Sequence, residues 1–178
     1  SNSKVIPMTN PKSSGLRTSG EVSAIDDRHI TRETTKAFNV EVIKSGSTIT
    51  HHIYKYFDTD GNHTANKIRD VQDKRFWSEG NVGTSLLFGE NMFSNGGKYI
   101  TVCEGEIDAM SVWQMNGKYP TVSIKNGAAS ALENCKKAFE YLNKFDTVVL
   151  CFDNDDPGRK AAQSVAKIFE PNKCKIVT

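Results

Sequence analysis

The stretch that decides the fold is "VCEGEIDAM", Val102 to Met110, where an apolar run ends and two carboxylates follow four positions apart. Glu104 comes directly after the run, Gly105 makes a strand-to-helix turn easy, and Asp108 lies one helical turn further on. Around it, residues 98–178 alternate apolar runs with segments of helical periodicity. The expected strands are "YITVC", "YPTVSI", "DTVVLCFD" and "KCKIVT". This βαβ order predicts a parallel sheet that is covered by helices on both faces.

A second acidic cluster, "CFDNDDPG" at residues 151–158, repeats the design at the end of a later strand. Asp153 and Asp155 are two positions apart, so their side chains point the same way in extended backbone. Functional groups gather at the carboxyl ends of parallel strands. We therefore expect both acidic clusters to form one pocket. Asp156 precedes Pro157, a pattern typical of an N-cap, and we assign it to structure.

The expected pocket would hold four carboxylates, which repel one another unless a cation neutralises them. Ligands that are all oxygen select a hard cation, and Mg²⁺ (or Mn²⁺) fits better than zinc because no His or CxxC pair is nearby. Such a site is suited to phosphoryl or nucleotidyl transfer. A DxD pair alone more often ends a strand or caps a helix; its pairing with ExxxD favours the metal site. The predicted ligands are Glu104, Asp108, Asp153 and Asp155.

The residues before the βαβ region divide into two parts. Residues 1–23 are rich in Ser, Asn, Gly and Pro, which is typical of a flexible linker or tail. Residues 24–97 begin with a helix signal in "ITRETTKAFNV", with Thr31 as a candidate N-cap, and continue with β-branched runs separated by the Asp-Gly turn of "DTDGN". The sequence thus predicts an α/β fold with an α+β N-terminal part: a small antiparallel-sheet subdomain at 24–97, then the parallel-sheet subdomain at 98–178.

One strand of the first subdomain is strongly basic and runs into two aromatic residues, Phe76 and Trp77. Basic side chains neutralise phosphates and aromatic rings stack on bases, so this is the best candidate for nucleic-acid binding. The alternative is a solvated strand face with Phe76 in the core, which the pattern alone favours. The basic residues are Lys67, Arg69, Lys74 and Arg75.

Composition narrows the remaining possibilities. The 178 residues are 37% hydrophobic and 25% charged, which is ordinary for a globular protein and argues against general disorder. The net charge of +2 neither implies nor excludes nucleic acid. Four widely spaced cysteines indicate small core residues in a reducing compartment. No apolar stretch is long enough to span a bilayer, so we expect no membrane partner and an intracellular location.

These motifs also carry a family resemblance. The pair "TVCEGEIDAMSV" and "VVLCFDNDDPGRKAA" resembles the Toprim fold shared by primases, topoisomerases and some nucleases. Over residues 24–178, "YFDTDGNHTANKIRD", "GGKYITVCEGEIDAMSV", "YPTVSIKNGAAS" and "FDNDDPGRKAA" follow the order seen in the primase part of bacteriophage T7-like primase-helicases, a family that includes the mitochondrial helicase Twinkle. The subfamily resemblance implies a DNA primase that makes short RNA primers during DNA replication.

The resemblance also implies roles for individual residues. Glu104 and Asp108 are the expected catalytic acids, with Glu104 helping to deprotonate the attacking 3′-hydroxyl, while the acids as a group organise metal and nucleotide. The resemblance favours a binding role for the basic strand over a merely solvated face, since the family uses this strand to contact template and nucleotide phosphates. Arg159, after DxD, could also meet phosphate, whereas Trp77 stands where the phage family usually has a further basic residue.

The resemblance further implies partners and alternatives. The expected partners are single-stranded DNA, ribonucleoside triphosphates, and the zinc ribbon and helicase domains of a longer chain, with DNA polymerase as a further candidate. These residues contain neither a CxxC pair nor a GxxxxGK[ST] loop. The resemblance implies that a full-length protein adds a 5′–3′ helicase, and that a phage protein acts in the host cytoplasm. The alternatives are a Toprim nuclease and a non-catalytic DNA-binding module that supports a helicase.

Overall fold

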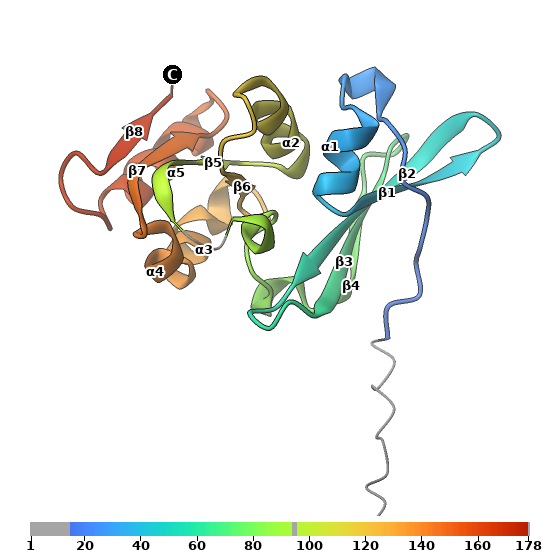
Figure 1. The fold of residues 1–178 in the computed structure, drawn as a ribbon, viewed down its shortest axis with the longest axis horizontal. Helices are drawn as coiled ribbons and strands as arrows, with labels where there is room; N and C mark the ends of the chain where they lie inside the picture. The colour runs from blue at the N-terminus through green and yellow to red at the C-terminus, as the bar shows by residue number, and fades with distance from the viewer. Residues whose placement is uncertain (1–14, 94–95, 178) are drawn as a thin grey trace, which may run out of the picture.

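Two four-stranded sheets form the two lobes of the structure, a computed structural model that describes residues 15–93 and 96–177 (Figure 1). The first sheet is antiparallel with strand order β1-β2-β3-β4, and the second is parallel with order β6-β5-β7-β8. The expected α/β fold with an antiparallel N-terminal part is therefore confirmed. Sequence periodicity predicted it because the pattern changes from alternating to βαβ near residue 97.

The first lobe is a meander behind one short helix. Thr31 caps α1 as predicted, since its Oγ1 accepts a hydrogen bond from the Thr34 amide at 3.2 Å. The last strand of this lobe, "FWSEG", was not predicted. Its sequence has no apolar alternation, and the strand is exposed along most of its length. The elements are α1 (Arg32–Ala37), β1 (Val40–Ser45), β2 (Thr48–Phe57), β3 (His63–Asp70) and β4 (Phe76–Gly80).

The second lobe follows the predicted βαβ order, with one difference. The helical segment "ASALENCKKAFEYLNKF", which has the periodicity of one amphipathic helix, is divided into α3 and α4 at Ala138. The strands are β5 (Gly97–Cys103), β6 (Thr121–Ser123), β7 (Phe145–Cys151) and β8 (Cys174–Ile176). The helices are α2 (Glu106–Met115), α3 (Ala131–Lys137), α4 (Phe139–Leu142) and α5 (Asp156–Ala166).

A shared apolar cluster joins the lobes. Tyr54 and Tyr56 of β2 are buried with Phe88 and with Ile107 and Met110 of α2. Because this core includes both a strand of the first sheet and a helix of the second, the lobes cannot separate without exposing aromatic surface. The relative position of the two sheets is thereby fixed.

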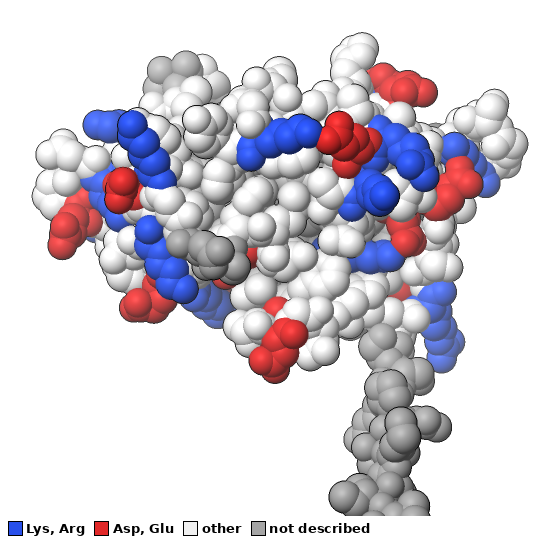
Figure 2. Space-filling model, in the orientation of Figure 1, with Lys and Arg blue, Asp and Glu red and all other residues white. Residues whose placement is uncertain are grey.

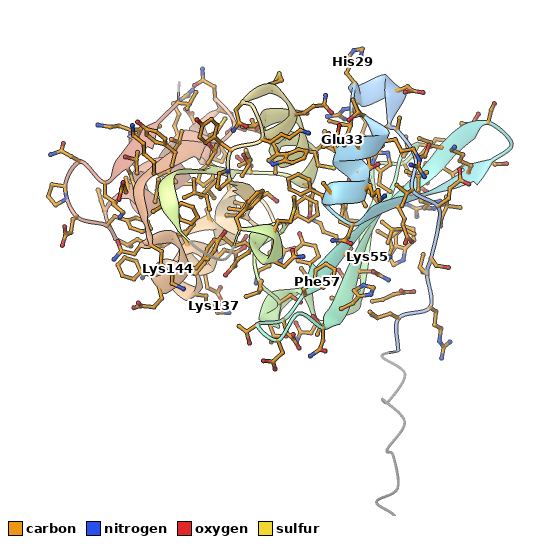
Figure 3. The ribbon with its side chains drawn as sticks, in the orientation of Figure 1. His29, Glu33, Lys55, Phe57, Lys137 and Lys144 are labelled. Carbon is orange, nitrogen blue, oxygen red and sulfur yellow. The ribbon has the colours of Figure 1, made fainter. Side chains whose placement is uncertain are left out.

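Polar contacts reinforce the join where α1 meets α2. Gln114 of α2 accepts a hydrogen bond from the Thr31 amide and donates one to the His29 carbonyl, at 2.9 and 2.8 Å. Glu33 of α1 forms an ion pair with Lys118, which follows α2. His29 and Glu33 both lie at the α1 end of the first lobe (Figure 3).

Part of the expected flexible tail is bound to the first sheet. Residues 1–14 lie outside the described part of the chain, but Glu79 of β4 accepts hydrogen bonds from the backbone of Arg17 and from both the backbone and the hydroxyl of Thr18. These bonds, with the Thr18 hydroxyl as the main cause, lower the pKa of Glu79 to about 2. Glu21 then pairs with Val42 of β1. The expectation of a flexible segment is therefore wrong for residues 15–23, because carboxylate and strand contacts hold them.

The surface carries both signs of charge. On the face seen in Figure 2, Lys and Arg side chains alternate with Asp and Glu side chains across both lobes. Among the helices of the described residues, none is long and apolar enough to cross a bilayer. Neither the net charge nor the charge distribution on this face identifies a partner.

Candidate active site between the two sheets

A cavity of about 540 Å³ lies where the carboxyl ends of the parallel strands meet the basic face of the antiparallel sheet. Three of the four predicted acids reach it, from the ends of β5 and β7 and the first turn of α2. Its lining residues are Lys67, Phe76, Glu104, Gly105, Glu106, Asp108, Asn126, Gly127 and Asp153. The strand-end rule thus correctly predicted that the two acidic clusters share one pocket.

Glu104 is held by backbone donors on both sides. Its Oε1 accepts a hydrogen bond from the Ala128 amide at 3.3 Å, and its Oε2 accepts one from the Asp153 amide at 3.1 Å. The carboxylate therefore bridges the loops that follow β6 and β7. Each oxygen keeps a further lone pair for a proton or a cation.

Asp108 shares the pocket with Asp153 and Glu104. The desolvating walls of the cavity, followed by the negative charge of Asp153 and then of Glu104, raise the pKa of Asp108 above its ordinary value, although the side chain remains exposed to water and Arg28 acts against the shift. The neighbouring carboxylates thus add to the effect of desolvation, because each negative charge disfavours ionisation of Asp108.

Gly105 does not have the backbone role that was predicted for it. It is the N-cap of α2 with φ −128° and ψ 163°, which is extended backbone open to any residue. The turn therefore does not depend on the conformational freedom of glycine. A Cβ at this position would lie 2.8 Å from Oδ2 of Asp108, so glycine leaves room for that carboxylate.

The N-cap of α5 differs from the predicted one. Asp155, not Asp156, is the N-cap, and its Oδ1 accepts a hydrogen bond from the Gly158 amide at 2.8 Å. Asp156 is the first helical residue and pairs with Arg159. The N-cap assignment of Asp156 is therefore wrong. The helix begins one residue earlier than expected because Asp155, at ψ 175°, takes the extended cap conformation.

The acids fit a divalent cation by their chemistry. Within residues 15–93 and 96–177, no three His, Cys, Asp or Glu side chains converge closely enough to form a ready cluster. Mg²⁺ needs only one or two protein carboxylates, since water and substrate phosphates complete its shell. Asp108 and Asp153 both line the cavity and would offer such a pair of oxygen ligands.

Lys67 has a buried partner that sequence reasoning missed. Its Nζ lies 2.7 Å from Oε1 of Glu106 and donates a hydrogen bond to the Lys125 carbonyl at 2.6 Å. The Tyr56 hydroxyl donates to the same Glu106 oxygen at 2.7 Å. Glu106 is only 5% exposed, so these partners are essential to a buried carboxylate. The sequence feature that could have indicated Glu106 is its position as an acid on the otherwise apolar inner face of α2.

Lys125 completes this arrangement and was also missed. It follows β6, is almost fully buried, and donates from Nζ to the carbonyls of Gly83 and Ser85 at 3.0 and 2.7 Å. Burial, more than any nearby charge, lowers its pKa. Lys125 therefore ties the loop after β4 to the end of the parallel sheet, on the same side as Lys67.

The four predicted basic residues lie in two different environments, the cavity side of the sheet and the solvent. Lys67 and Arg69 lie on the inner face of β3, and both approach the ring of Phe76, with Nζ 5.0 Å and Cζ 5.7 Å from its centroid. Lys74 and Arg75 are exposed in the β3–β4 turn, where Arg75 pairs with Asp73. The structure thus brings only the first two to the cavity side of the sheet.

The remaining predicted basic residue, Arg159, lies outside the acidic cavity. Arg159 of α5 donates to the carbonyl and side-chain oxygen of Asn154 and pairs with Asp156. It is exposed and does not line the acidic cavity. Its position is at the second acidic cluster but outside the pocket.

A second cavity of about 430 Å³ lies between the β2–β3 turn and the helices α3 and α4. Lys137 and Lys144, which Figure 3 shows on the parallel-sheet lobe, line it together with Asp58 and Glu90. Its charges are mixed, and none of the predicted site residues reaches it. The acidic cavity is both larger and chemically more distinct.

Comparisons with known proteins agree with this geometry. The family described as Toprim-like matches residues 101–178, which are the parallel-sheet lobe. A DNA helicase/primase of Enterobacteria phage T3 is 35% identical over 158 residues, covering 88% of this chain and 27% of that protein. The chain thus spans about a quarter of the length of this relative.

Two solved structures are similar over nearly the whole chain. The primase fragment of the bacteriophage T7 primase-helicase protein is 32% identical with a TM-score of 0.82, covering 97% of this chain and 74% of that one. The second, 35% identical with a TM-score of 0.79, covers 89% of this chain and 80% of the matched chain. It shows T7 lagging-strand DNA polymerase interacting with primase domains of two gp4 subunits bound to an RNA/DNA hybrid and dTTP.

Proposed function

The chain belongs to the primase family of bacteriophage T7-like primase-helicases, and we propose that it joins ribonucleoside triphosphates into short RNA primers on single-stranded DNA. The observation that carries the proposal is the cavity where Glu104, Asp108 and Asp153 face Lys67 across the two lobes. Carboxylates for a divalent cation on one wall and a cationic strand on the other suit nucleotidyl transfer.

The two lobes would have different functions. We assign template and nucleotide contacts to residues 24–97 and the metal-dependent chemistry to 98–178. Lys67 and Arg69 stand on the cavity side of the sheet, whereas Lys74, Arg75 and Arg159 are exposed where a nucleic-acid backbone could run past the rim.

Glu104 has the position of a general base. Backbone amides orient its carboxylate without using all its lone pairs, so it can take the proton from the attacking 3′-hydroxyl. Asp108, Asp153 and Asp155 would hold Mg²⁺ or Mn²⁺. When bound, the divalent ion supplies charge neutralisation for the triphosphate and the leaving pyrophosphate.

The larger setting of the domain follows from the relatives. A zinc ribbon and a helicase domain would belong to the same full-length protein, which would act with a DNA polymerase in the host cytoplasm. The primase domain would then place primers at the replication fork.

The test is primer synthesis by full-length protein carrying Glu104→Gln, with Glu170→Gln as a matched control on the exposed surface. The first change should abolish dinucleotide synthesis from triphosphates on template and the second should leave it unchanged. Undiminished synthesis by Glu104→Gln would refute the mechanism.

Two alternatives predict other outcomes in the same assay. A Toprim nuclease would cleave DNA in a metal-dependent manner and would release no primers. A non-catalytic DNA-binding module would bind single strands with strong salt dependence, and neither Mg²⁺ nor triphosphates would alter any measured property.

A further inference from the structure

Phe76 is an apolar side chain that the fold leaves in water. It is 51% exposed and lines the acidic cavity, in contrast to the buried aromatic residues Tyr54, Tyr56 and Phe88 nearby. Leaving a phenyl ring exposed forgoes the stabilisation that burial would give. A ring placed at the mouth of a polar cavity therefore suggests an aromatic or apolar occupant.

The strand register explains why this ring, and not its neighbour, reaches the cavity. Phe76 is opposite Arg69 in the β3–β4 pair, and directly paired residues share one face of a sheet. Trp77 is paired with Ile68 and lies on the other face, where its ring meets His51 edge-on at 5.5 Å between centroids. The two adjacent aromatic residues thus have different surroundings.

Two cations contact the Phe76 ring from one direction. Lys67 and Arg69 both belong to β3, and β4 is the edge strand of its sheet. The ring therefore meets cations from β3, while about half of its surface remains exposed. Cation–π contacts hold the ring in place while leaving that surface open for stacking.

We propose that Phe76 is the stacking surface for the base of the nucleoside triphosphate whose phosphates enter the acidic cavity. This rests on the proposed function. The cation-binding acids would hold the phosphates, and the ring at the mouth would hold the base. Stacking uses the π-face that every base has, so Phe76 binds all four nucleotides without selecting one by hydrogen bonds.

The experiment compares ATP with ribose 5-triphosphate, which has the same phosphates and sugar but no base. Isothermal titration calorimetry of the full chain with Mg²⁺ measures both affinities for wild type and for Phe76→Leu. Loss of one stacked base should weaken ATP binding about 5- to 150-fold. Binding of ribose 5-triphosphate should be unchanged.

Two further variants keep the result interpretable. Phe76→Trp should retain or increase ATP affinity, which a misfolded protein could not do. Trp77→Leu is a matched control, since this neighbour is 44% exposed but faces away from the cavity, and its ATP affinity should equal that of wild type.

Several results would overturn the inference. One is equal ATP affinity in wild type and Phe76→Leu; another is an equal loss for both ligands. A variant that binds a single-stranded oligonucleotide more weakly but binds ATP normally would place the ring against DNA and refute the assignment to the triphosphate. If wild type bound neither triphosphate, the proposed function would fail as well, whereas base-independent binding by wild type would refute only the stacking role.

Discussion

Nζ of Lys67 lies 2.7 Å from Oε1 of Glu106, and this ion pair joins β3 of the antiparallel sheet to α2 of the parallel-sheet lobe. The cation that sequence reasoning assigned to phosphate binding is therefore already bonded to a buried acid. Lys67 can still present positive charge to the cavity, but loss of its charge would also affect the join between the lobes.

Removing Lys67 should therefore destabilise the fold as well as the site. Lys67→Met leaves Glu106 as a buried carboxylate with Tyr56 as its remaining side-chain donor, which should cost about 3–5 kcal/mol in free energy of unfolding. Urea unfolding measures this loss. The double variant Lys67→Met/Glu106→Gln should recover part of it, because the buried charge is gone.

Loss of primer synthesis in Lys67→Met alone would not identify a phosphate contact. Synthesis that stays absent in the stable double variant would identify one. An additive double variant, with no recovery of stability, would contradict the coupling between these two side chains.

Asp108 should oppose folding near neutral pH. Its pKa in the folded chain lies above the ordinary value of 3.8, so folding favours the protonated acid. Ionised Asp108 therefore lowers the free energy of unfolding. This loss is absent at low pH, and it develops as pH rises from the pKa of the unfolded chain through the higher pKa of the folded chain. Asp108→Asn removes that loss and should be the more stable protein near about pH 7, although it would lose activity.

The expected gain is small, because Asp108 is open to solvent at the cavity and water screens its charge. A rise of about 2–4 °C in melting temperature without divalent ions would correspond to about 1 kcal/mol in a chain of this size. The gain should vanish in acid and shrink when Mg²⁺ is added. An equal gain at all pH values would contradict the assignment.

Asp155 has two separable roles. Asp155→Ala removes the cap of α5 and should cost about 0.5–2 kcal/mol of stability, whereas Asp155→Ser keeps a capping oxygen and should unfold like wild type. Both changes remove the carboxylate that we propose as a metal ligand, so both should lose primer synthesis. Normal synthesis by the stable Ser variant would assign Asp155 to capping alone.

The outline of the fold followed from periodicity and strand-end chemistry. Apolar runs alternating with helical segments determined the parallel sheet, and the acids directly after two of those runs had to lie at one edge because parallel strands end on the same side. Glu104, Asp108 and Asp153 were therefore predictable as a group. Strand β4 was not predictable, because its exposed sequence shows no alternation of apolar and polar residues.

The finer features of the site depended on contacts between distant segments. Whether Asp155 or Asp156 caps α5 was decided by one backbone angle, and whether Phe76 or Trp77 faces the cavity was decided by the register of β4 against β3. A shift of one residue in that register would reverse the two aromatic side chains.

The sequence by itself determined the two sheet types and the edge at which the acids gather, since those follow from local periodicity. Only the tertiary structure paired Lys67 with Glu106 and set Lys125 beneath the loop after β4. The reason is physical: a buried charge is stable only beside its partners. Here the partners come from the opposite lobe: those of Lys67 lie 39 and 58 positions further along the chain.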